Sequence, residues 1–312
     1  MTVLALIGAQ DVQKLVDAVA LGSIYALMAV GIGLVFGVMR LVNFAYGQLV
    51  MAGAYALYLS SRHGASTLEA ILVCFAVVIG LALLMEVVAF RRLRQATPAT
   101  MLVATFAISY LLQSIAVLWF GTLGNIDPVL QDLRRPFSLG NVYVAKITVV
   151  TVVVAALALA TLALLLNRTT IGLQLRAAAA DFVTARLLGV RGNAVVAAAV
   201  VVSGALAATV SVLLPVAQSP LITPDYALRD TIFVLVAVVV GGIDRLLSAT
   251  LGGFAVGFAV GLMGGFLPTR GEWPFTSSIY IDSALYTAVI LVLLFRPTGI
   301  FARRGQRAVE RV

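Results

Sequence analysis

Nine apolar runs, separated by short polar connectors, make up most of the 312-residue chain. The sequence is 62% hydrophobic and only 11% charged, with a mean hydropathy of +1.09. A water-soluble domain has about 25% charged residues, so this chain has too little polar surface to cover a soluble globule of its size. A helix that crosses a bilayer needs about 20 apolar residues. The sequence therefore argues against a soluble enzyme or a disordered chain, and predicts an all-α, polytopic membrane bundle.

Two of the nine runs are short for a membrane helix, and a short run either crosses at a tilt or re-enters on the same side. The runs cover residues 15–38, 46–60, 68–90, 99–120, 142–166, 194–216, 227–242, 248–267 and 279–295. The short runs are 46–60 and 227–242, so we expect eight or nine transmembrane or re-entrant segments. No polar stretch is long enough for a soluble domain, and residues 1–312 are expected to form a single membrane domain.

The basic residues collect in particular connectors. A net charge of +8 and a pI near 10.1 would, taken alone, suggest a nucleic-acid partner. With nine crossings, however, 14 of the 21 basic residues fall on one side of the membrane. Because cytoplasmic loops are enriched in Lys and Arg, that side is predicted to be cytoplasmic. The C-terminus is then cytoplasmic and the N-terminus external, and no nucleic-acid partner is expected.

Several kinds of site are unlikely on residue counts. Neither lysine, Lys14 or Lys146, follows a glycine, so the chain has no phosphate-binding Walker A loop. With only His63 and Cys74, a zinc site is not expected, and no apolar run holds a pair of carboxylates suited to catalysis. We therefore expect no metal and no catalytic residues. A secondary transporter or channel for a small polar solute stays open as an alternative, with Glu86 as its strongest ion-coupling carboxylate, although pairing with Arg91 or Arg92 is the simpler expectation.

Glycines and polar residues interrupt the helical pattern in two regions. The first is 31–48, which contains Gly31, Gly33 and Gly37 and then Asn43-Phe44-Ala45-Tyr46-Gly47-Gln48. The second begins at Gly241-Gly242 and continues through Gly253, Gly257 and Gly261. Close helix packing explains the last three glycines best. Paired, Gly-broken short segments can also line a transport path, and the buried amides of the first region favour that interpretation there.

Polar residues also recur within the longer runs. Thr105, Ser109 and Gln113 lie four residues apart, which places them on one stripe of one helix. That stripe either satisfies itself on backbone carbonyls or faces a polar cavity, and both readings stay open. Asp230 is expected near the outer end of its helix, where a carboxylate stabilises the N-terminus.

The connector 168–193 differs from the other loops. It has helix formers from Leu173 to Leu188 and a glycine stop at Gly189, which predicts one Ala-rich helical rod. The rod is too short to span the membrane and too apolar for a flexible linker. It suits insertion into a groove of a soluble partner, although attraction to the inner headgroups would also explain its arginines.

The order and spacing of these motifs resemble the permease subunit of bacterial branched-chain amino acid ABC importers, the high-affinity leucine/isoleucine/valine type. The first motif is Gly22-Ser-Ile-Tyr25-Ala-Leu, followed by Asn43-Phe44-Ala45-Tyr46-Gly47-Gln48. Further likeness lies in Glu86 with Arg91-Arg92-Leu-Arg94, in Thr105 and Ser109, in the 172–189 loop, and in the end Arg296-Pro297-Thr-Gly299-Ile300. The likeness covers nearly the whole chain.

The resemblance implies an inner-membrane, multi-pass subunit without a cofactor of its own. A second permease chain, two ATPase subunits that bind ATP and Mg, and a periplasmic binding protein would complete the importer. The implied substrate pathway and gate consist of Asn43, Phe44, Tyr46, Gly47, Gln48, Thr105, Ser109, Gln113, Gly241 and Gly242. The implied ATPase-docking residues are Gly172, Arg176, Ala177, Asp181, Ala185, Leu187, Leu188 and Gly189.

Two positions depart from the family pattern in the pathway motif. Tyr46 replaces a histidine of the family, and Gln48 replaces a glutamate. Related systems carry urea, short amides or aromatic acids, so the motif alone does not choose the substrate.

Overall fold

The computed structural model describes residues 9–266, apart from 41–42, 94–95, 127–128, 140–141 and 243–245, together with Ser283, Tyr286, Thr287 and Leu294. The long helices are α1 (Ala9–Met39), α3 (Thr67–Met85), α5 (Pro98–Phe120), α6 (Lys146–Arg168), α9 (Gly192–Ala217) and α11 (Leu246–Phe266). The shorter ones are α2 (Tyr46–Arg62), α4 (Arg91–Leu93), α7 (Thr170–Ala180), α8 (Phe182–Leu187) and α10 (Leu228–Gly241). A π-helical turn, Glu86–Phe90, joins α3 to α4, and a 3-10 turn covers Gln131–Arg134.

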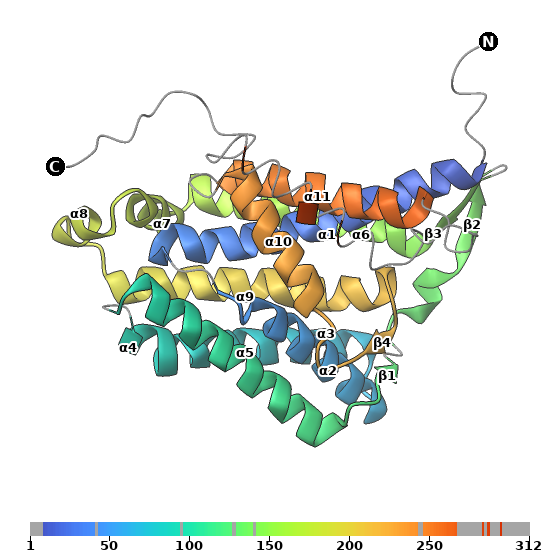
Figure 1. The fold of residues 1–312 in the computed structure, drawn as a ribbon, viewed down its shortest axis with the longest axis horizontal. Coiled ribbons are helices and arrows are strands. Elements are labelled where there is room, and N and C mark those ends of the chain that lie inside the picture. Colours follow the sequence, from blue (N-terminus) through green and yellow to red (C-terminus); the bar gives the residue numbers. More distant parts are fainter. Residues whose placement is uncertain are drawn as a thin grey trace, which may run out of the picture.

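The long helices lie side by side and give the bundle two distinct ends (Figure 1). One end holds α4, α7 and α8, and we call it the docking end. The other, the hairpin end, holds the hairpin of β2 (Pro136–Leu139) and β3 (Val142–Ala145) and the short pair β1 (Asn125–Ile126) and β4 (Leu221–Ile222). Both pairs are antiparallel, so the run expected from residue 142 begins as a strand and becomes helical only at Lys146.

Six helices are long and apolar enough to cross a membrane, which confirms a polytopic helical membrane protein. The six candidate membrane spans are Asp11–Met39, Thr67–Leu93, Ala99–Phe120, Lys146–Arg168, Gly192–Ala217 and Leu246–Phe266. Neither α2, with 17 residues, nor α10, with 14, is long enough to span alone. The ninth expected run, 279–295, lies outside the described residues except for four positions, and so does the C-terminus.

The glycines of α11 pack against α1. A Cβ atom on Gly253 would lie 2.7 Å from the carbonyl oxygen of Tyr25, and one on Gly257 would lie 2.9 Å from the Cα of Gly22. Farther along α11, a Cβ on Gly261 would lie 2.6 Å from the Cα of Ala18. The contacts move backward along α1 as they move forward along α11, so the two helices are antiparallel. The prediction of close packing for these three glycines is confirmed.

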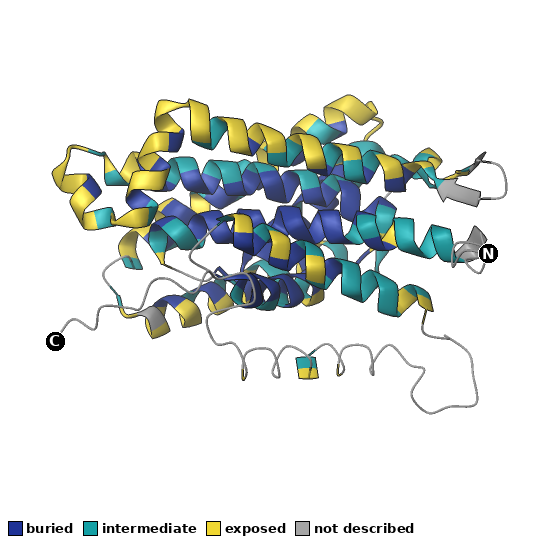
Figure 2. Ribbon diagram, turned by 90° about the horizontal axis from the view of Figure 1, so that it is seen from above, coloured by how far each residue is buried: buried dark blue, intermediate teal, exposed yellow. Residues whose placement is uncertain are grey.

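Burial is highest along the axis of the bundle, and the outer helices expose apolar side chains (Figure 2). Inside, the hydroxyl of Ser203 on α9 donates to the Gly31 carbonyl at 2.8 Å, and that of Ser211 donates to the Val50 carbonyl at 2.9 Å. These bonds join α9 to α1 and α2. Outside, leucines such as Leu118 on α5 and Leu157 on α6 are exposed. An apolar exterior is what a bilayer contacts, because lipid tails take the place of water as solvent.

Candidate functional site

Both short helices begin inside the bundle instead of at one of its ends. α2 begins at Tyr46, which lies against Gly31 of α1, about 12 Å before the end of α1 at Met39. α10 begins at Leu228, and its Asp230 bonds to Tyr25, near the middle of the 31-residue α1. From there α2 runs toward the hairpin end and α10 toward the docking end (Figure 1). Each short run is therefore a single short helix that begins inside the bundle.

The beginnings of α2 and α10 touch each other. A side chain on Gly47 would collide with the Thr231 hydroxyl oxygen and would lie 2.9 Å from the Ala227 carbonyl oxygen, closer than Cβ atoms come in proteins. A side chain on Gly31 would likewise collide with the Tyr46 ring. Both glycines therefore allow contacts that no other residue permits. We call the region around Gly47 and Thr231 the α2–α10 junction.

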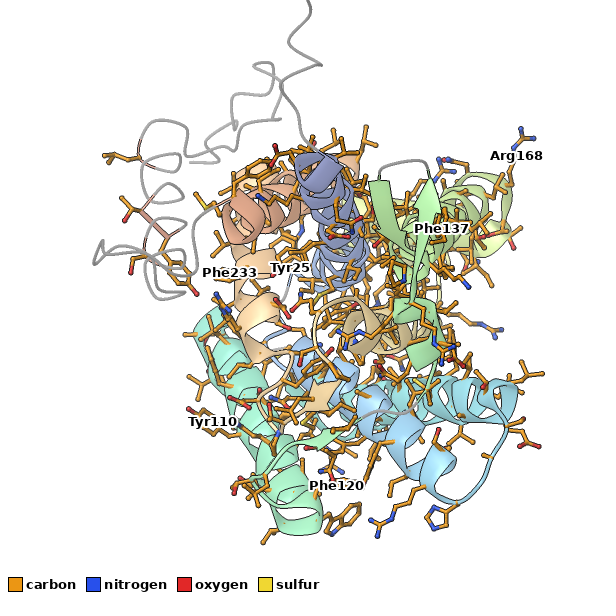
Figure 3. All side chains as sticks on the ribbon, turned by 90° about the vertical axis from the view of Figure 1, so that its right-hand side faces the viewer. Tyr25, Tyr110, Phe120, Phe137, Arg168 and Phe233 are labelled. Carbon is orange, nitrogen blue, oxygen red and sulfur yellow. The ribbon has the colours of Figure 1, made fainter. Side chains whose placement is uncertain are left out.

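A buried hydrogen bond ties the junction to α1. The Tyr25 hydroxyl donates to Asp230 Oδ1 at 2.5 Å, from α1 to the first turn of α10. Asp230 is 8% exposed and occupies the N-terminal turn of its helix, where its negative charge is favourable. Asp230 lies at a helix N-terminus, as predicted. That terminus, however, lies inside the bundle and not near an outer end. Figure 3, which looks at the bundle from the hairpin end, shows Tyr25 between α1 and the helix that carries Phe233.

The junction also contains polar atoms without partners among the described residues. Gln48 is 1% exposed and its Oε1 has no hydrogen-bond partner there, and neither has the buried Tyr46 hydroxyl. Asn43, in contrast, uses its Oδ1 to accept from the Ala45 amide at 3.0 Å and so orders the turn before α2. Because unpartnered buried polar groups are unfavourable, their presence calls for an explanation such as a function or a bound ligand.

The cavity beside Asn43 is small. It measures about 10 Å³ and is lined by Asn43 and Ser203 together with apolar side chains. That volume accommodates about one water molecule and no larger solute. The packing of the described residues beside Asn43 therefore leaves no space for a bound solute.

The three residues share one stripe of α5, as their spacing predicts, and that stripe faces the inside of the bundle. Thr105 and Ser109 are buried and Gln113 is half-buried. Thr105 donates to the Leu102 carbonyl at 2.9 Å, so part of its hydrogen bonding is satisfied on its own helix. Phe106 stacks on Phe44, with ring centroids 4.1 Å apart, which places this stretch of α5 against the turn that leads into α2.

Gly241 and Gly242 do not lie at the junction. They end α10, about 20 Å from its beginning. A side chain on Gly241 would collide with the Ser248 carbonyl of α11, and Gly242 has a φ of 109° that glycine adopts without strain. Close packing therefore explains Gly241, and the end of the helix explains Gly242. The first region, 43–48, instead meets the opposite end of α10, through Ala227 and Thr231.

At the docking end, the expected single rod is two helices. Asp181 separates α7 from α8, and its Oδ1 accepts from the Val183 and Thr184 amides at 3.0 and 3.1 Å. Because an aspartate N-cap favours non-helical backbone at its own position, the rod breaks there. The predicted stop at Gly189 is confirmed, with a φ of 91°.

The residues of the loop fall into two groups. Leu187 and Leu188 are more than 80% exposed, and Ala177 is exposed as well. Ala185 is buried, and Gly172 packs against the α6 backbone so closely that no side chain would fit. Arg176 turns back to α6, where its Nη1 donates to Asn167 Oδ1 at 3.3 Å. An apolar tip at Leu187 and Leu188 is suited to a protein partner.

Glu86, the candidate ion-coupling carboxylate, lies inside the bundle. Glu86 is 3% exposed, within the π-turn, and does not reach the surface as a snorkelling side chain would, whereas Arg91 and Arg92 are exposed. Among the described residues, no three His, Cys, Asp or Glu side chains are grouped to hold a metal ion.

Sequence reasoning missed the part played by Tyr25 and Thr231. In the sequence, Tyr25 is only a residue of a family motif, and nothing there pairs it with Asp230, which is 205 positions away. The shortness of run 227–242 was the available signal, since a half-length helix has to begin inside the bundle.

The arrangement of these helices is found in solved transport proteins. An inward-facing ABC transporter assigned to the metal-chelate type aligns with 92% of this chain and 87% of its own, at a TM-score of 0.52 and 17% identity. PsaBC from Streptococcus pneumoniae, solved with a Fab, aligns with 93% of this chain and 92% of its own, at a TM-score of 0.50 and 16% identity. At such identities the likeness concerns the fold alone, which is that of the membrane-spanning subunits of ABC transporters.

Sequence comparison then gives the family. A profile described as "Branched-chain amino acid transport system / permease component" matches residues 15–294. The chain is 32% identical to the high-affinity branched-chain amino acid transport system permease protein BraD of Pseudomonas aeruginosa and 31% identical to LivH of Escherichia coli K12. Each alignment covers 96% of this chain and 97% of the relative. The chain belongs to the branched-chain amino acid permease family, as its motifs predict, and is a permease component of an ABC transporter.

Proposed function

We propose that this chain is one of two membrane subunits of an ATP-driven importer in the bacterial inner membrane. It moves branched-chain amino acids, or a related small polar solute such as urea, an amide or an aromatic acid, from periplasm to cytoplasm. A second, related permease completes the pathway, two ATPases bind ATP and Mg, and a periplasmic protein delivers the solute. The α2–α10 junction carries this proposal, because two half-length helices meet there around buried polar atoms.

The charges support the proposed orientation. Basic residues of the described part gather at the docking end, among them Arg40, Arg91, Arg168, Arg186 and Arg191. The positive-inside rule makes that end cytoplasmic, where ATPases are available. The apolar tip at Leu187 and Leu188 then projects toward them, and movement of α7 and α8 as a rigid unit would pass ATPase closure to the bundle.

The solute class is set by relatives and by two local side chains. The curated relatives are named for branched-chain amino acids, and this chain shares their full length. Gln48 and Tyr46 offer an amide and a hydroxyl at the junction, which bind neutral polar groups as readily as charged ones. Amino acids therefore come first among the solutes, with urea and amides next.

Reconstitution tests the proposal directly. The permease pair, its ATPases and the binding protein are placed in proteoliposomes, and uptake of labelled leucine, isoleucine, valine, urea and phenylalanine is measured. We expect uptake of at least one solute that requires both internal ATP and the binding protein. Uptake driven by an ion gradient without ATP would contradict the proposal and support a secondary transporter.

A further inference from the structure

A large apolar groove lies outside the α2–α10 junction. Its volume is about 800 Å³, and it runs along α1 between α6 and α11 to α7. Its walls are mostly apolar and include Gly33 and Gly37 of α1, Ala163 of α6 and Leu247 of α11. Only three of the described wall residues are polar, Asn167, Arg176 and Thr250, and all three lie toward the docking end.

Small residues keep the groove deep without being needed for helix packing. A Cβ on Gly33 would lie 3.5 Å from that of Ala249, and a Cβ on Gly37 would lie 3.7 Å from that of Ala179. Both distances are ordinary contacts, unlike the collisions at Gly31 and Gly47. Glycine inside a helix is less favourable than alanine. Because packing does not require glycine at Gly33 and Gly37, the space that they leave is the feature that needs an explanation.

The groove has the length of one bilayer leaflet. From Val30 to the end of α1 at Met39 the helix rises about 14 Å. Half of a typical hydrocarbon core is about 15 Å. The wall also carries an exposed apolar side chain, Leu247, which is 73% exposed. An extended acyl chain therefore fits the groove in both length and polarity.

Positive charge lies where the groove meets the docking end. Arg176 forms part of the wall, and only one of its five N–H donors is used by the bond to Asn167. Arg40 donates to the carbonyl of Ala179, another wall residue, at 3.3 Å. Among the described residues, no acidic side chain lines the groove, and Asp181, close by in sequence, uses its carboxylate to cap α8. A phosphate at this position would be bound by guanidinium groups in the way typical of anionic lipid sites.

We propose that the groove binds one anionic phospholipid of the cytoplasmic leaflet, with an acyl chain along Gly33 and Gly37 and the phosphate on Arg176. Arg176 then belongs to a lipid site, and the ATPase contact of the loop is left to Leu187 and Leu188. The inference relies on the orientation contained in the proposed function. Labelling of Arg168→Cys, at the exposed docking-end terminus of α6, with an impermeant maleimide in intact cells and in lysed cells tests that orientation alone, since the native Cys74 is buried.

Native mass spectrometry of the purified complete complex tests the lipid site. The complex is delipidated and titrated with phosphatidylglycerol or phosphatidylethanolamine, for the wild type and for Ala163→Trp, which fills the groove. Ala107→Trp, on the exposed face of α5, is the matched control. We expect the wild type and the control to retain one more phosphatidylglycerol per permease chain than Ala163→Trp does.

A second pair of variants tests the phosphate contact. Arg176→Gln is expected to lower the preference for phosphatidylglycerol over phosphatidylethanolamine about fivefold, the effect of one arginine near an anionic surface. Arg186→Gln, on α8 outside the groove, should keep the wild-type preference. Equal lipid counts in Ala163→Trp and the wild type would overturn the proposal. So would loss of permease pairing in Ala163→Trp without a change in bound lipid, because a protein chain would then occupy the groove.

Discussion

Replacement of Gly47 by alanine tests the contact between α2 and α10. The new methyl group would meet the Thr231 hydroxyl and lie 2.9 Å from the Ala227 carbonyl oxygen. Ordinary contacts begin near 3.4 Å, so the two helix beginnings would have to separate by about 0.5 Å. Overpacking of this kind destabilises a protein by about 1–3 kcal/mol. The higher helix propensity of alanine, worth about 0.5–1 kcal/mol, offsets only part of that loss.

The matched control is Gly80→Ala on α3. A Cβ at Gly80 meets nothing within 4 Å, so only the gain in helix propensity remains. Unfolding by SDS in mixed micelles should show Gly47→Ala less stable than the wild type and Gly80→Ala slightly more stable. Uptake in proteoliposomes should fall for Gly47→Ala alone. If both variants gain stability equally, the close approach at the junction is wrong.

Two further substitutions test other parts of the account. Tyr25→Phe removes the donor to buried Asp230 and should lower the free energy of unfolding, measured by SDS titration, by about 1.5–3 kcal/mol. The control, Tyr110→Phe on the exposed face of α5, should leave the free energy of unfolding unchanged. Asp181→Ala removes the N-cap of α8, and such a cap stabilises a helix by about 0.5–2 kcal/mol. Amide hydrogen exchange at residues 183–187 should therefore become faster, and ATP-driven uptake should fall. Unchanged exchange there would show that the cap does not hold α8.

Local patterns in the sequence predicted much of the architecture. The apolar runs predicted the long helices, because a helix that crosses a bilayer needs a minimum length of apolar sequence. The spacing of Gly253, Gly257 and Gly261 predicted a packed face, and α1 lies on it. The break at Asp181 could have been predicted as well, since an aspartate directly before the apolar residues Phe182 and Val183 is an N-cap signal.

The contacts at the junction could not be predicted in this way. Tyr25 and Asp230 are 205 positions apart, and only the packed bundle brings them together. Gly241 and Gly242 suggested a second gate because two glycines interrupt an apolar run, yet Gly241 contacts α11 and Gly242 ends α10. Glycine serves equally at a gate, a turn and a packed face, so its presence alone does not distinguish these roles.

The central claim is that solute passes the α2–α10 junction, and Gln48→Leu tests it most directly. Gln48 Oε1 is buried without a partner in the described part of the chain, and such a group is unfavourable by about 1–3 kcal/mol. Leucine fills a similar volume without that acceptor, so the variant should be more stable than the wild type. The account predicts that its ATP-driven uptake nevertheless falls at least about tenfold, the effect of about 1.4 kcal/mol on a barrier. A stabilised variant with full uptake would contradict the claim.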